Sequence, residues 1–156
     1  MEYLEITMPK RKKIALVAHD HKKTEIVEWA KRQREILSNH DLYATGTTGA
    51  LIEKETKLNV EKFRSGPLGG DLEIGAMISA GELDCLVFFW DPLAAQPHDP
   101  DVRALLRIAV VWNIPVVSNI ASADFMFSSP FMAGEYRRLV PDYEEQKRKD
   151  WPLMGR

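Results

Sequence analysis

The sequence predicts a single-domain, three-layer α/β fold, in which a mostly parallel five-stranded sheet carries helices on both faces. Two observations favour this fold. Short apolar runs alternate with longer helical stretches along the chain, as in strand–helix–strand units. Polar or glycine-rich segments follow four of the apolar runs, at the edge where such sheets bind ligands. We expect one domain over residues 1–156, with a charged C-terminal tail over residues 143–156.

The expected elements follow from apolar spacing and from the residues that interrupt it. Strands are expected at residues 14–18, 42–44, 60–63, 85–89 and 115–118, with a last short one at 139–140. Helices are expected at residues 22–37, 49–56, 71–80, 102–112 and 121–127, and in the charged run 144–150. Gly81 is a favourable C-terminal stop for the third of these helices.

Composition limits the classes of partner. The chain has 156 residues and a formal net charge of −2, which gives no general attraction for nucleic acid or membrane. No apolar run approaches the roughly 20 residues that span a bilayer, and the N-terminus lacks a signal-peptide pattern. The single Cys85 excludes an internal disulfide and fits a cytoplasmic protein. The basic run 9–13 is interpreted as a solvated lead-in to the first strand.

Three groups of donors at the predicted ligand edge suit a phosphate. Residues 45–49 (TGTTG) join a strand to a helix N-terminus, where free amides and hydroxyls bind anions. Ser65 and Gly66 follow the next strand, and Lys23 adds a charge in the first helix. The alternative is that Thr47 or Thr48 only caps the helix. The loop has no Walker lysine, so it gives no support for nucleotide hydrolysis.

Proton-handling groups lie at the same edge. His98 stands between carboxylates in a loop with three prolines, and His19 ends the first strand. Asp71 follows two glycines at a helix start, where it is either a general base or simply the N-cap. Asp101 is interpreted as a cap for the helix that starts at Val102. No cysteine cluster or helical histidine pair is present, so we expect no metal.

Seven segments together resemble the methylglyoxal synthase family: 14–21 (IALVAHDH), 42–49 (LYATGTTG), 65–71 (SGPLGGD), 88–92 (FFWDP), 97–102 (PHDPDV), 112–115 (WNIP) and 123–125 (ADF). The resemblance covers about Lys13 to Tyr143. It implies a lyase that converts dihydroxyacetone phosphate to methylglyoxal and inorganic phosphate without metal or organic cofactor. It also implies a homo-oligomer, usually a hexamer, that phosphate inhibits.

The resemblance also implies a role for each matching residue. Asp71 is the base that removes a proton from C3 of the substrate, His98 contacts the substrate oxygens and moves protons on the enediolate, and Asp101 is a supporting carboxylate. The substrate-binding positions are His19, Lys23, Thr45, Gly46, Thr47, Thr48, Ser65, Gly66 and His98.

Asp20 and Arg107 match positions tied to communication between subunits. The family often has a basic residue near position 150 for this purpose, whereas this chain has Asp150. Arg148 is the basic residue that we assign to the contact instead.

Two rival functions are considered, and the first of them occurs on this fold. A non-catalytic phosphate-ligand sensor needs the donors but no base, so the joint presence of Asp71, His98 and Asp101 argues against it. An isomerase forms the same enediolate and is distinguished by an aldose phosphate as its product.

Overall fold

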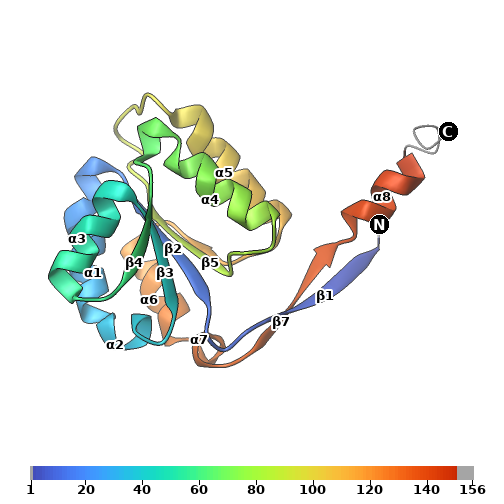
Figure 1. Ribbon diagram of the computed structural model, residues 1–156, viewed down its shortest axis with the longest axis horizontal. Helices are drawn as coiled ribbons and strands as arrows, with labels where there is room; N and C mark the ends of the chain where they lie inside the picture. The colour runs from blue at the N-terminus through green and yellow to red at the C-terminus, as the bar shows by residue number, and fades with distance from the viewer. Residues whose placement is uncertain (1, 151–156) are drawn as a thin grey trace.

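The computed structural model describes residues 2–150 and confirms the predicted fold class (Figure 1). Five parallel strands form one sheet in the order β4-β3-β2-β5-β6. The strands are β2 (Lys13–Ala18), β3 (Asp41–Thr45), β4 (Val60–Phe63), β5 (Cys85–Phe89) and β6 (Val116–Val117). The helices are α1 (Lys23–Arg32), α2 (Arg34–Leu37), α3 (Gly46–Thr56), α4 (Gly70–Ser79), α5 (Asp99–Val111), α6 (Ile120–Ser128), α7 (Pro130–Ala133) and α8 (Tyr143–Asp150).

Alternating side chains of the central strands build two separate cores, one on each face of the sheet. Ile14 and Leu16 of β2 pack with α1, α3 and α6, whereas Ala15 and Val17 pack with α4 and α5. This division follows from the period of two in a strand, which sends neighbouring side chains to opposite faces. The result is the three-layer arrangement that the sequence predicts.

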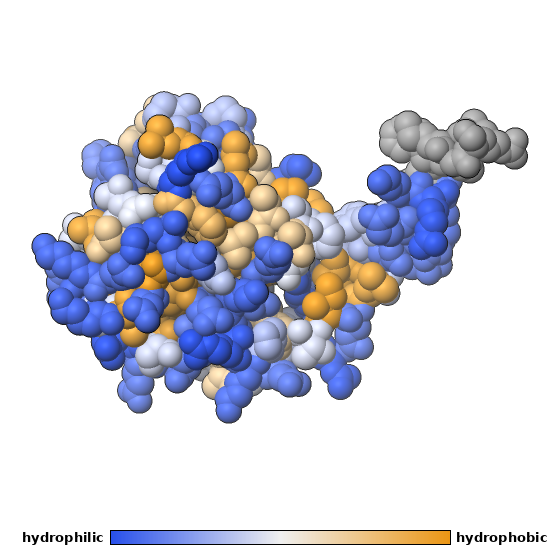
Figure 2. All heavy atoms as spheres, viewed as in Figure 1, coloured by the Kyte–Doolittle hydropathy of each residue, from blue (hydrophilic) through white to orange (hydrophobic). Residues whose placement is uncertain are grey.

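The chain also forms an arm that the sequence analysis did not predict. Strand β1 (Tyr3–Met8) pairs antiparallel with β7 (Tyr136–Pro141) in a second, two-stranded sheet. The predicted strand at 139–140 is therefore part of a longer one. This two-stranded arm and helix α8 extend away from the body of the protein in Figure 1. Figure 2 shows apolar side chains on the arm and charged ones on α8; Leu4 and Leu139 are exposed there.

Element boundaries differ in places from the predicted ones. The helix expected over 22–37 is divided at Gln33 into α1 and α2. Helix α3 starts at Gly46 and α5 at Asp99, each three residues earlier than predicted, and α7 was not predicted. The expected exposed helix in the tail is present as α8, and residues 151–156 of the predicted tail lie outside the described residues.

Cys85 is a core thiol, as the sequence analysis expected. It begins β5 and is buried, and burial raises the pKa of its thiol to about 12. The thiol therefore stays protonated at neutral pH.

Candidate active site

A pocket of about 250 Å³ lies at the carboxyl edge of the parallel sheet, where the sequence predicts the ligand site. It forms between the ends of β2 and β3, the loop after β4 and the loop before α5. Its lining residues are Val17, Ala18, His19, Asp20, Lys23, Thr45, Thr47, Ser65, Gly66, Pro67, Gln96 and His98.

His19 presents a hydrogen-bond donor to this pocket. Its Nδ1 accepts the backbone N–H of Asp91 at 3.0 Å, so the proton of the neutral ring lies on Nε2. That Nε2 is buried and has no partner among the described residues. Burial lowers the pKa of His19, and the nearby His98 lowers it further, so the ring stays neutral. His19 is therefore ready to donate to a ligand oxygen.

Asp71 is a buried carboxylate without a hydrogen-bond partner in the described part of the chain. It is the second residue of α4 and is 1% exposed, and neither of its oxygens is hydrogen-bonded. Burial raises the pKa of Asp71, while His98 lowers it and Asp101 raises it further. Because an unpaired buried carboxylate costs free energy, its place at a pocket points to a ligand or a reaction.

His98 adjoins Asp71 and the pocket. Its Nε2 lies 3.5 Å from Asp71 Oδ2, and its Nδ1 is buried without a partner among residues 2–150. The ring stands edge-on to His19, with ring centroids 5.6 Å apart. Two imidazoles and one carboxylate thus converge on one small volume, which is an arrangement suited to proton transfer.

The helix caps are not the ones that the sequence offered as alternatives. The N-cap of α4 is Gly69, whose φ of +101° suits glycine, and no side chain caps that helix. The N-cap interpretation of Asp71 is therefore wrong. The same holds for Asp101, which lies inside the first turn of α5, where His98 is the N-cap.

The predicted phosphate donors surround one side of the pocket. Thr45 is the N-cap of α3 with no side-chain cap bond, so neither Thr47 nor Thr48 caps this helix. Thr47 and Ser65 line the pocket, whereas Thr48 does not line it and has a buried Oγ1 that lacks a partner among the described atoms. Lys23 reaches the edge, with its Nζ 3.2 Å from the carbonyl oxygen of Ala18.

Three glycines lie where other groups approach the backbone closely. A methyl group on Gly66 would lie 2.7 Å from His98 Nε2 and 3.4 Å from Asp71 Oδ1. A methyl group on Gly70 would lie 1.9 Å from the carbonyl oxygen of Arg64, and one on Gly46 would lie 3.0 Å from that of Phe63. These glycines let the loops pack closely around His98 and Asp71.

The residues expected to communicate between subunits do not meet within one chain. Asp20 accepts a hydrogen bond from Lys23 Nζ at 2.8 Å, which lowers the pKa of that carboxyl. Arg107 is exposed on α5, and Arg148 is exposed on α8, where its Nε donates to the Glu144 carbonyl.

Gln96 and Pro67 line the pocket but were not among the predicted site residues. The only signal for Gln96 was its position in the loop that precedes His98. Among the described residues, no group of three histidine, cysteine or acidic side chains is placed to hold a metal ion. The described helices include none that is long and apolar enough to cross a membrane.

The fold and the pocket define the class of protein. Residues 25–118 match the model of the MGS-like domain. The chain is 60% identical to the methylglyoxal synthase of Saccharophagus degradans over 88% of this chain and 89% of that one. It is 55% identical to that of Leptospira interrogans over 94% and 99%.

A solved structure agrees with these matches. The crystal structure of methylglyoxal synthase from Elizabethkingia anophelis has a TM-score of 0.86 and 51% identity, covering 92% of this chain and 94% of that one. The chain belongs to the methylglyoxal synthase family, as the resemblance of its motifs predicts.

Proposed function

We propose that the carboxyl-edge pocket binds dihydroxyacetone phosphate and eliminates its phosphate through an enediolate, with Asp71 as the base. As a member of the methylglyoxal synthase family, the chain is a carbon–oxygen lyase. The observation that supports the residue roles best is the contact of His98 with the buried, unpaired Asp71.

The first step removes a proton from C3, the carbon that bears the free hydroxyl. An Asp71 oxygen takes this proton, and the electron pair of the C–H bond forms the C2–C3 double bond of the enediolate. The raised pKa of Asp71 makes it a stronger base than an exposed aspartate. The Nε2–H of His19 and the imidazole of His98, which both line the pocket, stabilise the negative charge on the substrate oxygens.

The second step expels phosphate. His98 carries a proton from the C3 hydroxyl to the C2 oxygen, so that C3–O becomes a carbonyl as the C1–O bond breaks. The products are the enol of methylglyoxal, which tautomerises to methylglyoxal, and inorganic phosphate. Asp101 supports this chemistry through its charge, which keeps the Asp71 pKa raised.

Elimination and isomerisation diverge at the enediolate. If the bond from C1 to the phosphate oxygen stands perpendicular to the enediolate plane, its orbital overlaps with the π electrons and phosphate leaves. If it lies in the plane, the enediolate survives to be reprotonated as an aldose phosphate. We propose that Lys23, the Thr45–Thr48 turn and the Ser65–Gly66 turn hold the phosphate out of the plane.

Regulation and assembly are further parts of the proposal. Inorganic phosphate fits the same donors as the substrate phosphate and therefore competes with it. A homohexamer would bring Asp20, Arg107 and Arg148 to neighbouring subunits, since they do not pair with one another in a single chain. A cytoplasmic location fits the reduced, buried Cys85.

Proton and phosphorus NMR of the protein with dihydroxyacetone phosphate test this proposal. We expect methylglyoxal and inorganic phosphate in equal amounts. Glyceraldehyde phosphate as the main product would instead indicate an isomerase, and unchanged substrate with bound phosphate would indicate a sensor. A crystal structure with a hydroxamate mimic of the enediolate tests the geometry, because a phosphate lying in the plane of the mimic would contradict it.

A further inference from the structure

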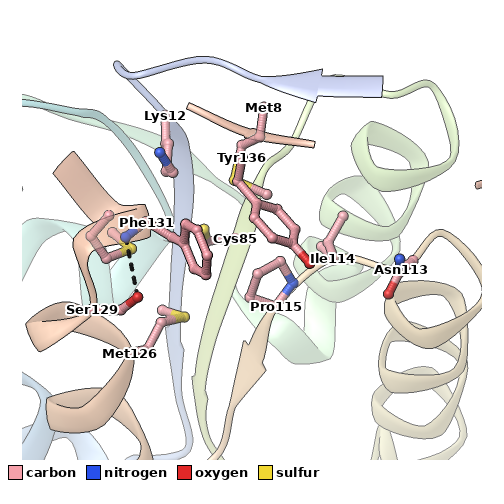
Figure 3. Close-up of a pocket in the computed structure, with 11 residues that line it drawn as sticks. Met8, Lys12, Cys85, Asn113, Ile114, Pro115, Met126, Ser129, Phe131 and Tyr136 are labelled. Carbon is pink, nitrogen blue, oxygen red and sulfur yellow. Dashed lines mark hydrogen bonds between the residues drawn. The ribbon is translucent and has the colours of Figure 1, made fainter. Parts of the chain in front are cut away.

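A second cavity lies at the opposite, amino edge of the sheet, between the foot of the arm and α6 and α7 (Figure 3). Its volume is about 350 Å³, within the range of small-molecule sites. The walls are largely apolar and come from segments far apart in the sequence. They include Met8, Ile114, Met126, Phe131 and Met132.

Two buried cations lie at this cavity or beside it. Lys12 lines the cavity and is 1% exposed, and Arg138 of β7 is 2% exposed. Among the side chains that the structure describes, no carboxylate forms an ion pair with either residue. Burial lowers the pKa of both groups. Buried charges without a counter-ion are costly, so this edge favours an anion.

Both cations keep a free donor. Lys12 Nζ donates to the carbonyl oxygens of Pro9 at 3.0 Å and Gly134 at 2.7 Å, which leaves one of its three N–H groups without an acceptor in the described residues. Arg138 donates through Nη1 to the Trp112 carbonyl, while its Nε is buried and unpaired within residues 2–150. The charge of Asp84 acts to raise the pKa of both cations, but this carboxylate already accepts the Lys13 amide and forms no ion pair with either of them among the described residues.

We propose that this cavity binds a small monocarboxylate with an aliphatic body, such as hexanoate. The carboxylate accepts the free N–H of Lys12, and the alkyl chain packs on the three methionines. A phosphate needs several convergent donors, whereas one free ammonium hydrogen beside apolar walls suits a single carboxylate.

The site is separate from the active site. Lys12 directly precedes β2 and His19 directly follows it, so the two residues are about 20 Å apart along an extended strand. The proposal does not depend on the reaction at the carboxyl edge.

Methionine-methyl NMR of the wild-type protein, with ¹³C-methyl labels, tests the proposal directly. On titration with sodium hexanoate we expect the methyl signals of Met8, Met126 and Met132 to shift together. Met77 of α4 packs in the core on the other face of the sheet and is the internal control, so its signal stays in place. Single Met→Leu variants assign the four signals.

Two comparisons isolate the carboxylate contact. Hexanol has the same alkyl chain without the charge, and we expect it to bind at least about tenfold more weakly to the wild-type protein. Lys12→Met replaces the ammonium group with an apolar side chain of similar length, and it should weaken the binding of hexanoate by about tenfold as well. The hexanol comparison needs no variant, so it decides the question even if Lys12→Met fails to fold.

Four outcomes would overturn the proposal. The methyl signals could stay unmoved at saturating hexanoate, or hexanol could bind as tightly as hexanoate. If inorganic phosphate reversed the shifts, hexanoate would be binding at the active site rather than in this cavity. Methyl signals that ignore hexanoate but change on dilution would show that a second copy of the chain fills the cavity instead.

Discussion

The two ends of β2 treat their buried polar groups in opposite ways. At the amino end, Lys12 uses two of its three donors on backbone carbonyls, and its own amide donates to Nδ1 of the buried His40 at 3.0 Å. At the carboxyl end, His19 Nε2 and both oxygens of Asp71 have no hydrogen-bond partner in the described residues. At the amino edge, Lys12 ties the arm to the body with two donors and keeps one free, whereas the carboxyl edge leaves all of these donors and acceptors for a ligand.

This difference carries an energetic consequence. Burying a polar group without a partner costs about 1–3 kcal/mol, and a charged group costs more. A protein retains such groups where a substrate supplies the missing partner, so substitutions at the two ends should affect different properties.

The largest expected effect is the loss of turnover in Asp71→Asn. An amide cannot accept the C3 proton, so we expect kcat to fall by about 10³-fold or more. Phosphate binding should be retained, because the donor turns are untouched. Steady-state kinetics and phosphate titration measure both. Asp41→Asn, an exposed carboxylate at the amino end of β3 that pairs with Arg11, is the matched control and should keep its kcat. Near-normal turnover in Asp71→Asn would remove this residue from the role of base.

A smaller loss of activity is expected for Gly66→Ala. The added methyl group would lie 2.7 Å from His98 Nε2, so the imidazole must move. A displacement of about 1 Å at a catalytic group costs roughly 10²-fold in kcat. Gly75→Ala is the control, because nothing lies within 4 Å of a methyl group there. Equal kcat values for the two variants would show that the close approach has no catalytic importance.

At the amino edge, Lys12→Met should reduce stability. The variant loses two charge-assisted hydrogen bonds, and we expect the free energy of unfolding to fall by about 1–3 kcal/mol. Urea unfolding measures this change. Lys31→Met, at an exposed lysine that pairs only with Glu28 among the described residues, should stay within about 0.5 kcal/mol of the wild type. A Lys12→Met protein as stable as Lys31→Met would contradict the structural role of Lys12.

The smallest effect is the pH dependence that His40 contributes. Burial lowers the pKa of His40 below its usual value near 6.5, and the positive charges of Lys12 and Arg11 lower it further. As pH falls, His40 therefore binds a proton at a higher pH in the unfolded chain than in the folded chain. Stability from this group is complete above about pH 6.5 and is lost as pH falls toward the lowered pKa.

His40→Gln should flatten this slope, since Gln cannot be protonated but can still accept the Lys12 amide. Urea unfolding between about pH 5 and 7 compares the two proteins. His19 adds a slope of the same sign to both. Parallel curves for the wild type and the variant would show that His40 does not contribute.

The carboxyl edge could be predicted from the sequence because its signals are local. Each strand is followed directly by its polar or glycine-rich loop, so the parallel topology brings His19, Thr45, Ser65 and His98 together. Gln96 escaped prediction because its position depends on how the proline-rich loop folds back, which no spacing encodes.

The amino edge could not be predicted, because it depends on contacts between distant parts of the chain. Strand β1 pairs with β7, about 130 residues away, and pairing over such a distance leaves no periodic signal. The interpretation of the basic run 9–13 as solvated was wrong for Lys12, which is buried against the Gly134 carbonyl. Only the folded arm explains why a lysine in a basic run is buried.

Thermal unfolding of Asp71→Asn tests most directly whether the carboxyl edge holds its polar groups for a ligand rather than for the fold. The folded-state pKa of Asp71 is raised, so its charge costs stability at neutral pH, and this cost disappears at low pH. The amide removes the charge, so we predict a midpoint at or above that of the wild type, by about 2–4 °C for each kcal/mol regained. A midpoint several degrees lower would show that Asp71 is a structural residue and would contradict the account.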